Sequence, residues 1–148
     1  MTRLNTTARA GNVIYGTNLR EAVSTASVNL TILGHLPSMK NGRAIFRNRM
    51  TGKPFSAKSN EARAYAGSFV LQVPAECKRL ALGSEKTPLR AIVSVWYRSN
   101  RSDLDTALVY DCLQAAGVIS NDRYVLEHHE FKHIDRRNPR VEITLEEL

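Results

Sequence analysis

The alternation of apolar and polar positions predicts two strong β-strands. Residues 27–33 alternate with a period of two and are rich in β-branched side chains, which is typical of a strand with one buried face. Residues 90–97 are apolar on both faces, which predicts a central strand of a sheet. Two more strands are expected at residues 125–134 and 140–145, as a pair around the turn at residues 135–139.

Two helices and a hairpin complete the pattern. Apolar residues from Ala62 to Val73 recur at helical spacing, with Ser59 as the expected N-cap and Pro74 as the stop. Residues 104–116 predict a second helix, which Gly117 ends in the position that favours a left-handed C-cap. Residues 44–46 and 53–55 flank the turn at residues 50–52 and predict a short hairpin.

This order of elements predicts an α+β or mixed α/β fold, in which the helices pack on a single sheet. The 148 residues suffice for one ordinary domain, which we expect to span residues 26–148. Residues 1–25 are mostly polar and lack clear periodicity. We expect them to form an N-terminal arm that is loosely ordered or contains a short helix around Leu19 to Val23.

Composition indicates a globular protein with no membrane partner. Apolar residues make up 43% of the chain and charged residues 24%, and no stretch approaches the roughly 20 apolar residues that a membrane span needs. The first residues lack the apolar segment of a secretory signal. Cys77 and Cys112 form no disulfide framework, so we expect a reducing, cytoplasmic setting with both thiols free.

The net charge of +7 is unevenly distributed along the chain. Residues 1–101 hold 16 basic and 4 acidic side chains, whereas residues 102–148 hold 5 basic and 10 acidic ones. A basic body with an acidic cluster suits a polyanionic ligand whose chemistry needs carboxylates, although the charges also fit a merely solvated surface. The densest positive stretch contains Lys40, Arg43, Arg47, Arg49, Lys53, Lys58 and Arg63.

Three aspartates flank the second predicted helix. Asp103 and Asp105 precede it, and Asp122 follows its end. Two carboxylates two residues apart share a face only in an extended segment, so joint metal binding requires the helix to begin at or after Asp105. Spacing alone favours another interpretation, in which Ser102 and Asp105 form a capping box and Asp122 belongs to an ordinary turn.

Three segments of the chain resemble the RusA-type Holliday-junction endonucleases. They are residues 36–43 (LPSMKNGR), 101–105 (RSDLD) and 110–122 (YDCLQAAGVISND), within a similarity that covers about residues 27–146. The resemblance implies a homodimeric nuclease of DNA recombination and repair that cuts four-way DNA junctions by paired symmetric nicks, using Mg²⁺. It also implies that the catalytic and metal-binding residues are Asp103, Asp105 and Asp122.

The basic stretch fits the same interpretation. Its side chains can follow the phosphates of branched DNA, which predicts salt-sensitive binding with little dependence on base sequence. Mg²⁺ prefers hard oxygen ligands and binds through few carboxylates together with substrate phosphates. The residues expected to contact DNA are Lys40, Asn41, Arg43, Arg47, Arg49, Lys53, Lys58 and Arg101.

The chain also departs from the pattern of this family. Thr106 replaces an asparagine, Val109 occupies the place of a lysine, and Asn121 replaces the first of two aspartates. Valine cannot supply a cation near a phosphate, and the charge would have to come from Arg98, Arg101 or Lys132. The departures leave an alternative open: a catalytically weak or inactive protein that binds branched DNA. A generic basic adaptor is a third hypothesis, and it predicts no preference for branched DNA.

Overall fold

The computed structural model describes residues 5–10, 13–18, 27–39 and 43–148, and it contains two sheets with two helices. The larger sheet has six strands in the order β1-β2-β3-β8-β6-β7, and all neighbours are antiparallel except β6 and β7. Its strands are β1 (Asn5–Ala10), β2 (Val13–Asn18), β3 (Ser27–Leu33), β6 (Leu89–Tyr97), β7 (Val125–Ile134) and β8 (Arg140–Glu147). The predicted mixed α+β class is therefore confirmed.

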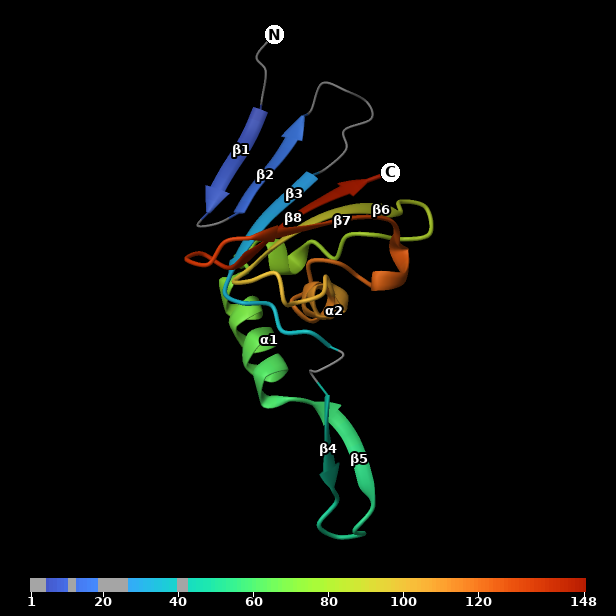
Figure 1. Ribbon diagram of the computed structural model, residues 1–148. Coiled ribbons are helices and arrows are strands. Elements are labelled where there is room, and N and C mark those ends of the chain that lie inside the picture. Colours follow the sequence, from blue (N-terminus) through green and yellow to red (C-terminus); the bar gives the residue numbers. More distant parts are fainter. Residues whose placement is uncertain (1–4, 11–12, 19–26, 40–42) are drawn as a thin grey trace.

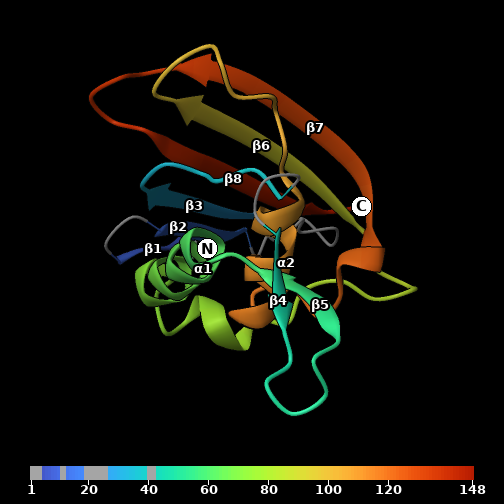
Figure 2. The ribbon, with the colours of Figure 1, turned by 60° about the horizontal axis from the view of Figure 1, so that its bottom comes forward.

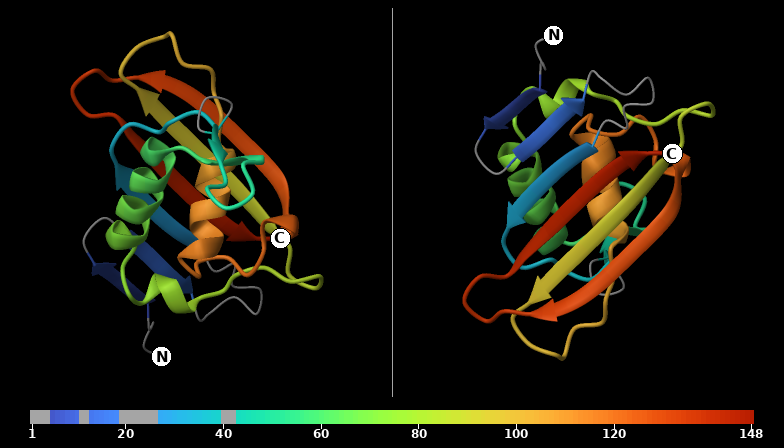
Figure 3. Two further views of the ribbon diagram at one scale, coloured as in Figure 1. Left: turned by 90° about the horizontal axis from the view of Figure 1, so that it is seen from below. Right: turned by 90° about the horizontal axis from the view of Figure 1, so that it is seen from above.

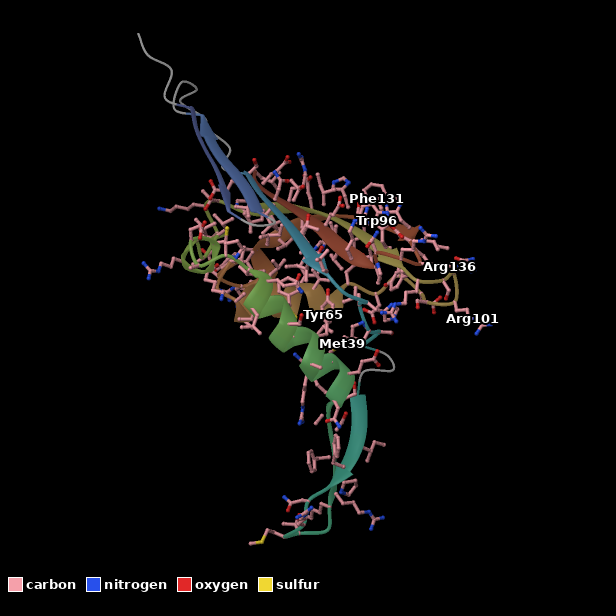
Figure 4. All side chains as sticks on the ribbon, turned by 90° about the vertical axis from the view of Figure 1, so that its left-hand side faces the viewer. Met39, Tyr65, Trp96, Arg101, Phe131 and Arg136 are labelled. Carbon is pink, nitrogen blue, oxygen red and sulfur yellow. The ribbon has the colours of Figure 1, made fainter. Side chains whose placement is uncertain are left out.

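Both helices, α1 (Asn60–Gln72) and α2 (Ala107–Ala115), cover the same face of this sheet (Figure 3). Alternate residues of β6 are buried against them, from Leu89 to Tyr97, which is 2% exposed. The opposite face has no helix over it in the described part of the chain, and Trp96 and Phe131 lie there (Figure 4). One layer of helices on one side of the sheet thus forms the core.

The two helices begin and end for identifiable reasons. Ser59 caps α1 by accepting a hydrogen bond from the backbone N–H of Ala62 at 3.2 Å, as predicted. Gly117 follows α2 with a φ of +76°, the predicted left-handed conformation. The predicted start of α2 at residue 104 was wrong, because the helix begins at Ala107.

The second sheet is the predicted hairpin, which consists of β4 (Arg43–Arg47) and β5 (Pro54–Lys58). It extends away from the larger sheet, beyond the two helices (Figure 1 and Figure 2), and Lys58 at its base lies 3.4 Å from Asp111 of α2. Two short 3₁₀ helices, η1 (Cys77–Arg79) and η2 (Asp122–Tyr124), lie in the connections.

Two expectations about the sheet need correction. Strands β7 and β8 both form, but each pairs with β6 and they do not pair with each other. The connection at residues 135–139 is long enough to pass over one intervening strand, since neighbouring strands lie only about 4.8 Å apart. In addition, β1 and β2 extend the sheet beyond β3, where no strand was predicted. The helix expected at Leu19 to Val23 lies outside the described residues.

Candidate functional site

The candidate site lies where the connection from β6 to α2 meets the segment after β3. Residues 102–106 are not helical, so Asp103 and Asp105 precede α2, and the helix begins late enough for joint metal binding. The Asp105 Oδ2 accepts hydrogen bonds from the backbone N–H of Met39 at 2.8 Å and from the Ser38 hydroxyl at 3.1 Å. Two of the three sequence segments that carry the family resemblance therefore meet at this carboxylate.

Asp105 also organises the start of α2. Its Oδ1 accepts a hydrogen bond from the backbone N–H of Ala107 at 3.3 Å, and its own N–H donates to the Tyr97 hydroxyl, also at 3.3 Å. The expected capping box of Ser102 is not the arrangement found, because Thr106 occupies the N-cap position and makes no side-chain cap. The carboxylate of Asp105 thus has a structural role as well as the chemistry proposed for it.

A polar pocket of about 360 Å³ is lined in part by Asp103 and by Ser38, the hydrogen-bond partner of Asp105. Asp103 is exposed to solvent and Asp105 is half-buried. The side chains that line the pocket come from the segment after β3, the first turn of α1 and the segment before α2; they include His35, Ser38, Glu61, Arg101, Ser102 and Asp103. The pocket combines carboxylate oxygens with a guanidinium, so it offers groups for both a cation and a phosphate.

Sequence reasoning missed Glu130, which β7 brings next to this segment. Thr106 is 6% exposed, and its hydroxyl donates to Glu130 Oε1 at 2.6 Å. The Tyr110 hydroxyl lies 3.3 Å from the same oxygen. Glu130 follows Thr106 by 24 residues and Tyr110 by 20, so its contact with them depends on the position of β7 beside β6, which is not a local feature of the sequence.

The carboxylates influence the buried tyrosines beside them. Burial raises the pKa of Tyr97, and the negative charges of Asp105, Asp103 and Glu130 raise it further, although the hydrogen bond from the Asp105 N–H acts in the opposite direction. Burial is also the main cause of the raised pKa of Tyr110, followed by the charge of Glu130. Both phenols therefore stay protonated at neutral pH and serve as hydrogen-bonding groups.

The third predicted aspartate lies elsewhere. The backbone N–H of Asp122 donates to Gln114 Oε1 at the C-terminal end of α2, whereas Asp105 precedes the N-terminal end. The nine residues of α2 span about 13 Å. The structure thus places Asp103 at the pocket and Asp105 at the start of α2, two residues apart, and leaves Asp122 at the far end of the helix. Within the described ranges, no group of three or more His, Cys, Asp or Glu residues is arranged to hold a metal ion.

The two carboxylates still suit Mg²⁺. This ion commonly binds through one or two carboxylates and keeps several waters, and the pocket beside Asp103 is accessible to solvent. Asp103 and Asp105 are the residues that would hold it.

The predicted DNA-contacting residues fall into three groups. Arg47, Arg49 and Lys53 are exposed on the hairpin, and Arg101 is exposed at the pocket. Lys58 is 3.4 Å from Asp111 of α2, which ties the base of the hairpin to the body. Lys40 and Asn41 lie outside the described residues, as does the side chain of Arg43.

The structure limits which residues could supply the positive charge that Val109 lacks. Val109 is fully buried in the core, so no charge could replace it there without desolvation. Lys132 reaches the connection from β6 to α2, which contains Asp103 and Asp105. Its Nζ donates to the Asn100 carbonyl at 3.2 Å and lies 5.9 Å from the centre of the Tyr97 ring. Arg101 lines the pocket itself. Arg101 therefore lies at the pocket with Asp103, and Lys132 contacts the neighbouring Asn100.

No protein-family model matches the chain, and no curated protein matches it either. Among the described residues, no helix is long and apolar enough to cross a membrane.

Proposed function

We propose that this protein is a Mg²⁺-dependent, structure-specific endodeoxyribonuclease that resolves four-way DNA junctions by paired symmetric nicks. The observation that supports this most strongly is the contact between the Ser38–Met39 segment and Asp105, beside Asp103 and an open polar pocket. It joins the two sequence segments that carry the family resemblance. Recombination and repair of DNA in the cytoplasm would be the setting.

Each group near the pocket has a definite task in this proposal. Asp103 and Asp105 would hold the cation, which would supply charge neutralisation and an activated water at the scissile phosphate. The donors from Ser38 and Met39 fix the orientation of the Asp105 carboxylate before substrate binds. Arg101 binds the phosphate, and its guanidinium offsets the negative charge that grows during hydrolysis.

The homodimer remains part of the proposal, whereas Asp122, at the far end of α2, has no task at the pocket. Paired nicks require two active sites, and a second copy of the chain provides the second one. The sheet face without helices is the surface that we assign to this contact. It bears Trp96 stacked on His133 at 4.5 Å between ring centres, with the half-exposed Phe131 nearby in the same strand as His133.

A non-catalytic protein that binds branched DNA is the second candidate. The buried Val109 and the distance of Asp122 from the other aspartates favour it, because both remove groups that the catalytic interpretation uses. In that case the basic hairpin would bind DNA and Asp105 would serve only to organise the fold.

Substitution of Asp103 distinguishes the two candidates, because this side chain is exposed and makes no contribution to the core. We expect Asp103→Asn to abolish metal-dependent cleavage of a labelled four-way junction while its affinity in a gel-shift assay stays within about twofold of wild type. The matched control is Glu85→Gln, which removes an exposed carboxylate in the loop before β6. This variant should cleave normally. Full cleavage by Asp103→Asn would reject the catalytic assignment.

A further inference from the structure

The hairpin of β4 and β5 ends in a well-defined turn at the point farthest from the body (Figure 1). Asn48 Oδ1 accepts hydrogen bonds from the backbone N–H groups of Met50 at 2.8 Å and Thr51 at 3.3 Å. Gly52 adopts a φ of +67° and donates its N–H to the Asn48 carbonyl at 2.8 Å. The turn therefore holds Met50 in one backbone conformation.

The two strands are braced below the turn. Phe46 and Phe55 face each other across the hairpin, with ring centroids 5.7 Å apart. Stacked cross-strand aromatic pairs stabilise an isolated two-stranded ribbon, which otherwise has little core of its own. Lys58 anchors its base to Asp111.

Apolar side chains on this ribbon face solvent. Met50 is 94% exposed at the turn, and Ile45 is 80% exposed on β4. The same ribbon carries three exposed cationic side chains, Arg47, Arg49 and Lys53, together with uncharged ones such as Asn48 and Thr51. Purely electrostatic attachment to phosphates would not need an apolar tip, so the combination requires a ligand that is both anionic and able to accept an apolar group.

We propose that the hairpin enters branched DNA at the branch point and that Met50 inserts between bases as an apolar wedge. This rests on the proposed function only in taking branched DNA as the ligand. A two-stranded ribbon fits the major groove, and methionine is among the side chains that proteins insert between base steps. The bases at a branch point are the least costly to separate. Arg47, Arg49 and Lys53 hold the flanking phosphates.

A lipid surface is the competing occupant, and the geometry disfavours it. One methionine and one isoleucine bury too little apolar area to hold a protein on a membrane, because stable anchoring needs more than one such signal. DNA needs only a single side chain between two bases.

The test uses the full-length protein and a four-way junction that carries 2-aminopurine beside the branch point, with chelator present to prevent cleavage. Wild type should raise the fluorescence as the base unstacks. Met50→Ala should lose most of this rise and bind the junction about tenfold more weakly, with linear-duplex binding changed less than about twofold. Leu71→Ala, which is 84% exposed on α1, is the matched control and should behave as wild type.

A second variant separates the wedge from the phosphate contacts. Arg47→Ala should weaken binding to junction and duplex alike and reduce the slope of log affinity against log salt by about 1. If Met50→Ala behaves in this way, or retains the full fluorescence rise, the wedge is rejected. A larger effect of Met50→Ala on binding to anionic phospholipid vesicles than on junction binding would also reject it.

The outcomes separate this inference from the nuclease proposal. Metal-dependent cleavage by wild type together with an unaffected Met50→Ala would reject the wedge alone. Unstacking that depends on Met50 without any metal-dependent cleavage would reject the nuclease alone.

Discussion

The bond between Thr106 and Glu130 gives a quantitative prediction about the candidate site. Thr106 directly follows Asp105, and its buried hydroxyl donates to Glu130 Oε1 at 2.6 Å. Thr106→Val keeps the shape of the side chain and removes the donor. The connection from β6 to α2 would then lose the hydrogen bond that Thr106 donates to Glu130 of β7.

The expected cost follows from the environment of the acceptor. A hydrogen bond to a charged group contributes about 1.5–3 kcal/mol to stability. Glu130 keeps 30% of its side chain exposed and has Tyr110 at 3.3 Å, so water and the phenol compensate in part and the lower end applies. We expect Thr106→Val to lower the free energy of unfolding by about 1.5 kcal/mol. For 148 residues this corresponds to a fall in Tm of about 3–6 °C.

Thermal unfolding followed by calorimetry measures this change, and a double-mutant cycle assigns it to the bond. In a Glu130→Ala background the hydroxyl has already lost this acceptor, so Thr106→Val should be neutral or slightly stabilising. An equal cost in both backgrounds would show that the bond does not carry the effect. A loss below about 0.5 kcal/mol in the wild-type background would equally refute the reasoning.

Two further predictions concern the core around α2. Gly117→Ala should destabilise the fold by more than about 1 kcal/mol in urea unfolding, because φ is +76° and the new Cβ would lie 2.4 Å from the Lys78 carbonyl oxygen. Gly67→Ala in α1, which meets no atom within 4 Å, should instead be neutral or stabilising, and equal effects of the two would contradict this account. Burial raises the pKa of Cys112 to about 11, whereas an unfolded thiol titrates near 8.5. As the pH rises, unfolded chains lose the Cys112 proton at a lower pH than folded chains do, so the free energy of unfolding should fall between about pH 8.5 and 11. Rapid labelling of Cys112 in the native protein at pH 8 would contradict the raised pKa.

Periodicity predicted the elements whose signal is local. The alternation in β3 and β6 and the apolar stripe of α1 each report burial on one face, and Ser59 marks the start of α1 through chemistry within one turn. Strand pairing is not local, because the edges of β6 are shared by β7 and β8 from different parts of the chain. The strands β1 and β2 were missed because their residues show no consistent apolar alternation.

The same difference between local and non-local contacts applies to the candidate site. Asp103 and Asp105 are two residues apart, so the sequence could place them together once the helix start was known. The contact between Ser38 and Asp105 joins residues 67 positions apart, and Glu130 reaches Thr106 only through the register of β7. The position of Asp122 depends on how the chain continues beyond α2, which spacing alone cannot fix.

Cleavage of a labelled mobile four-way junction by the wild-type protein tests the central proposal most directly. The products are resolved on a denaturing gel beside a matched linear duplex, with Mg²⁺ or with chelator. We predict paired symmetric nicks in the junction that appear only with Mg²⁺, and an uncut duplex. A junction that is retarded in a native gel but remains uncut with Mg²⁺ would contradict the nuclease proposal and favour a protein that only binds branched DNA.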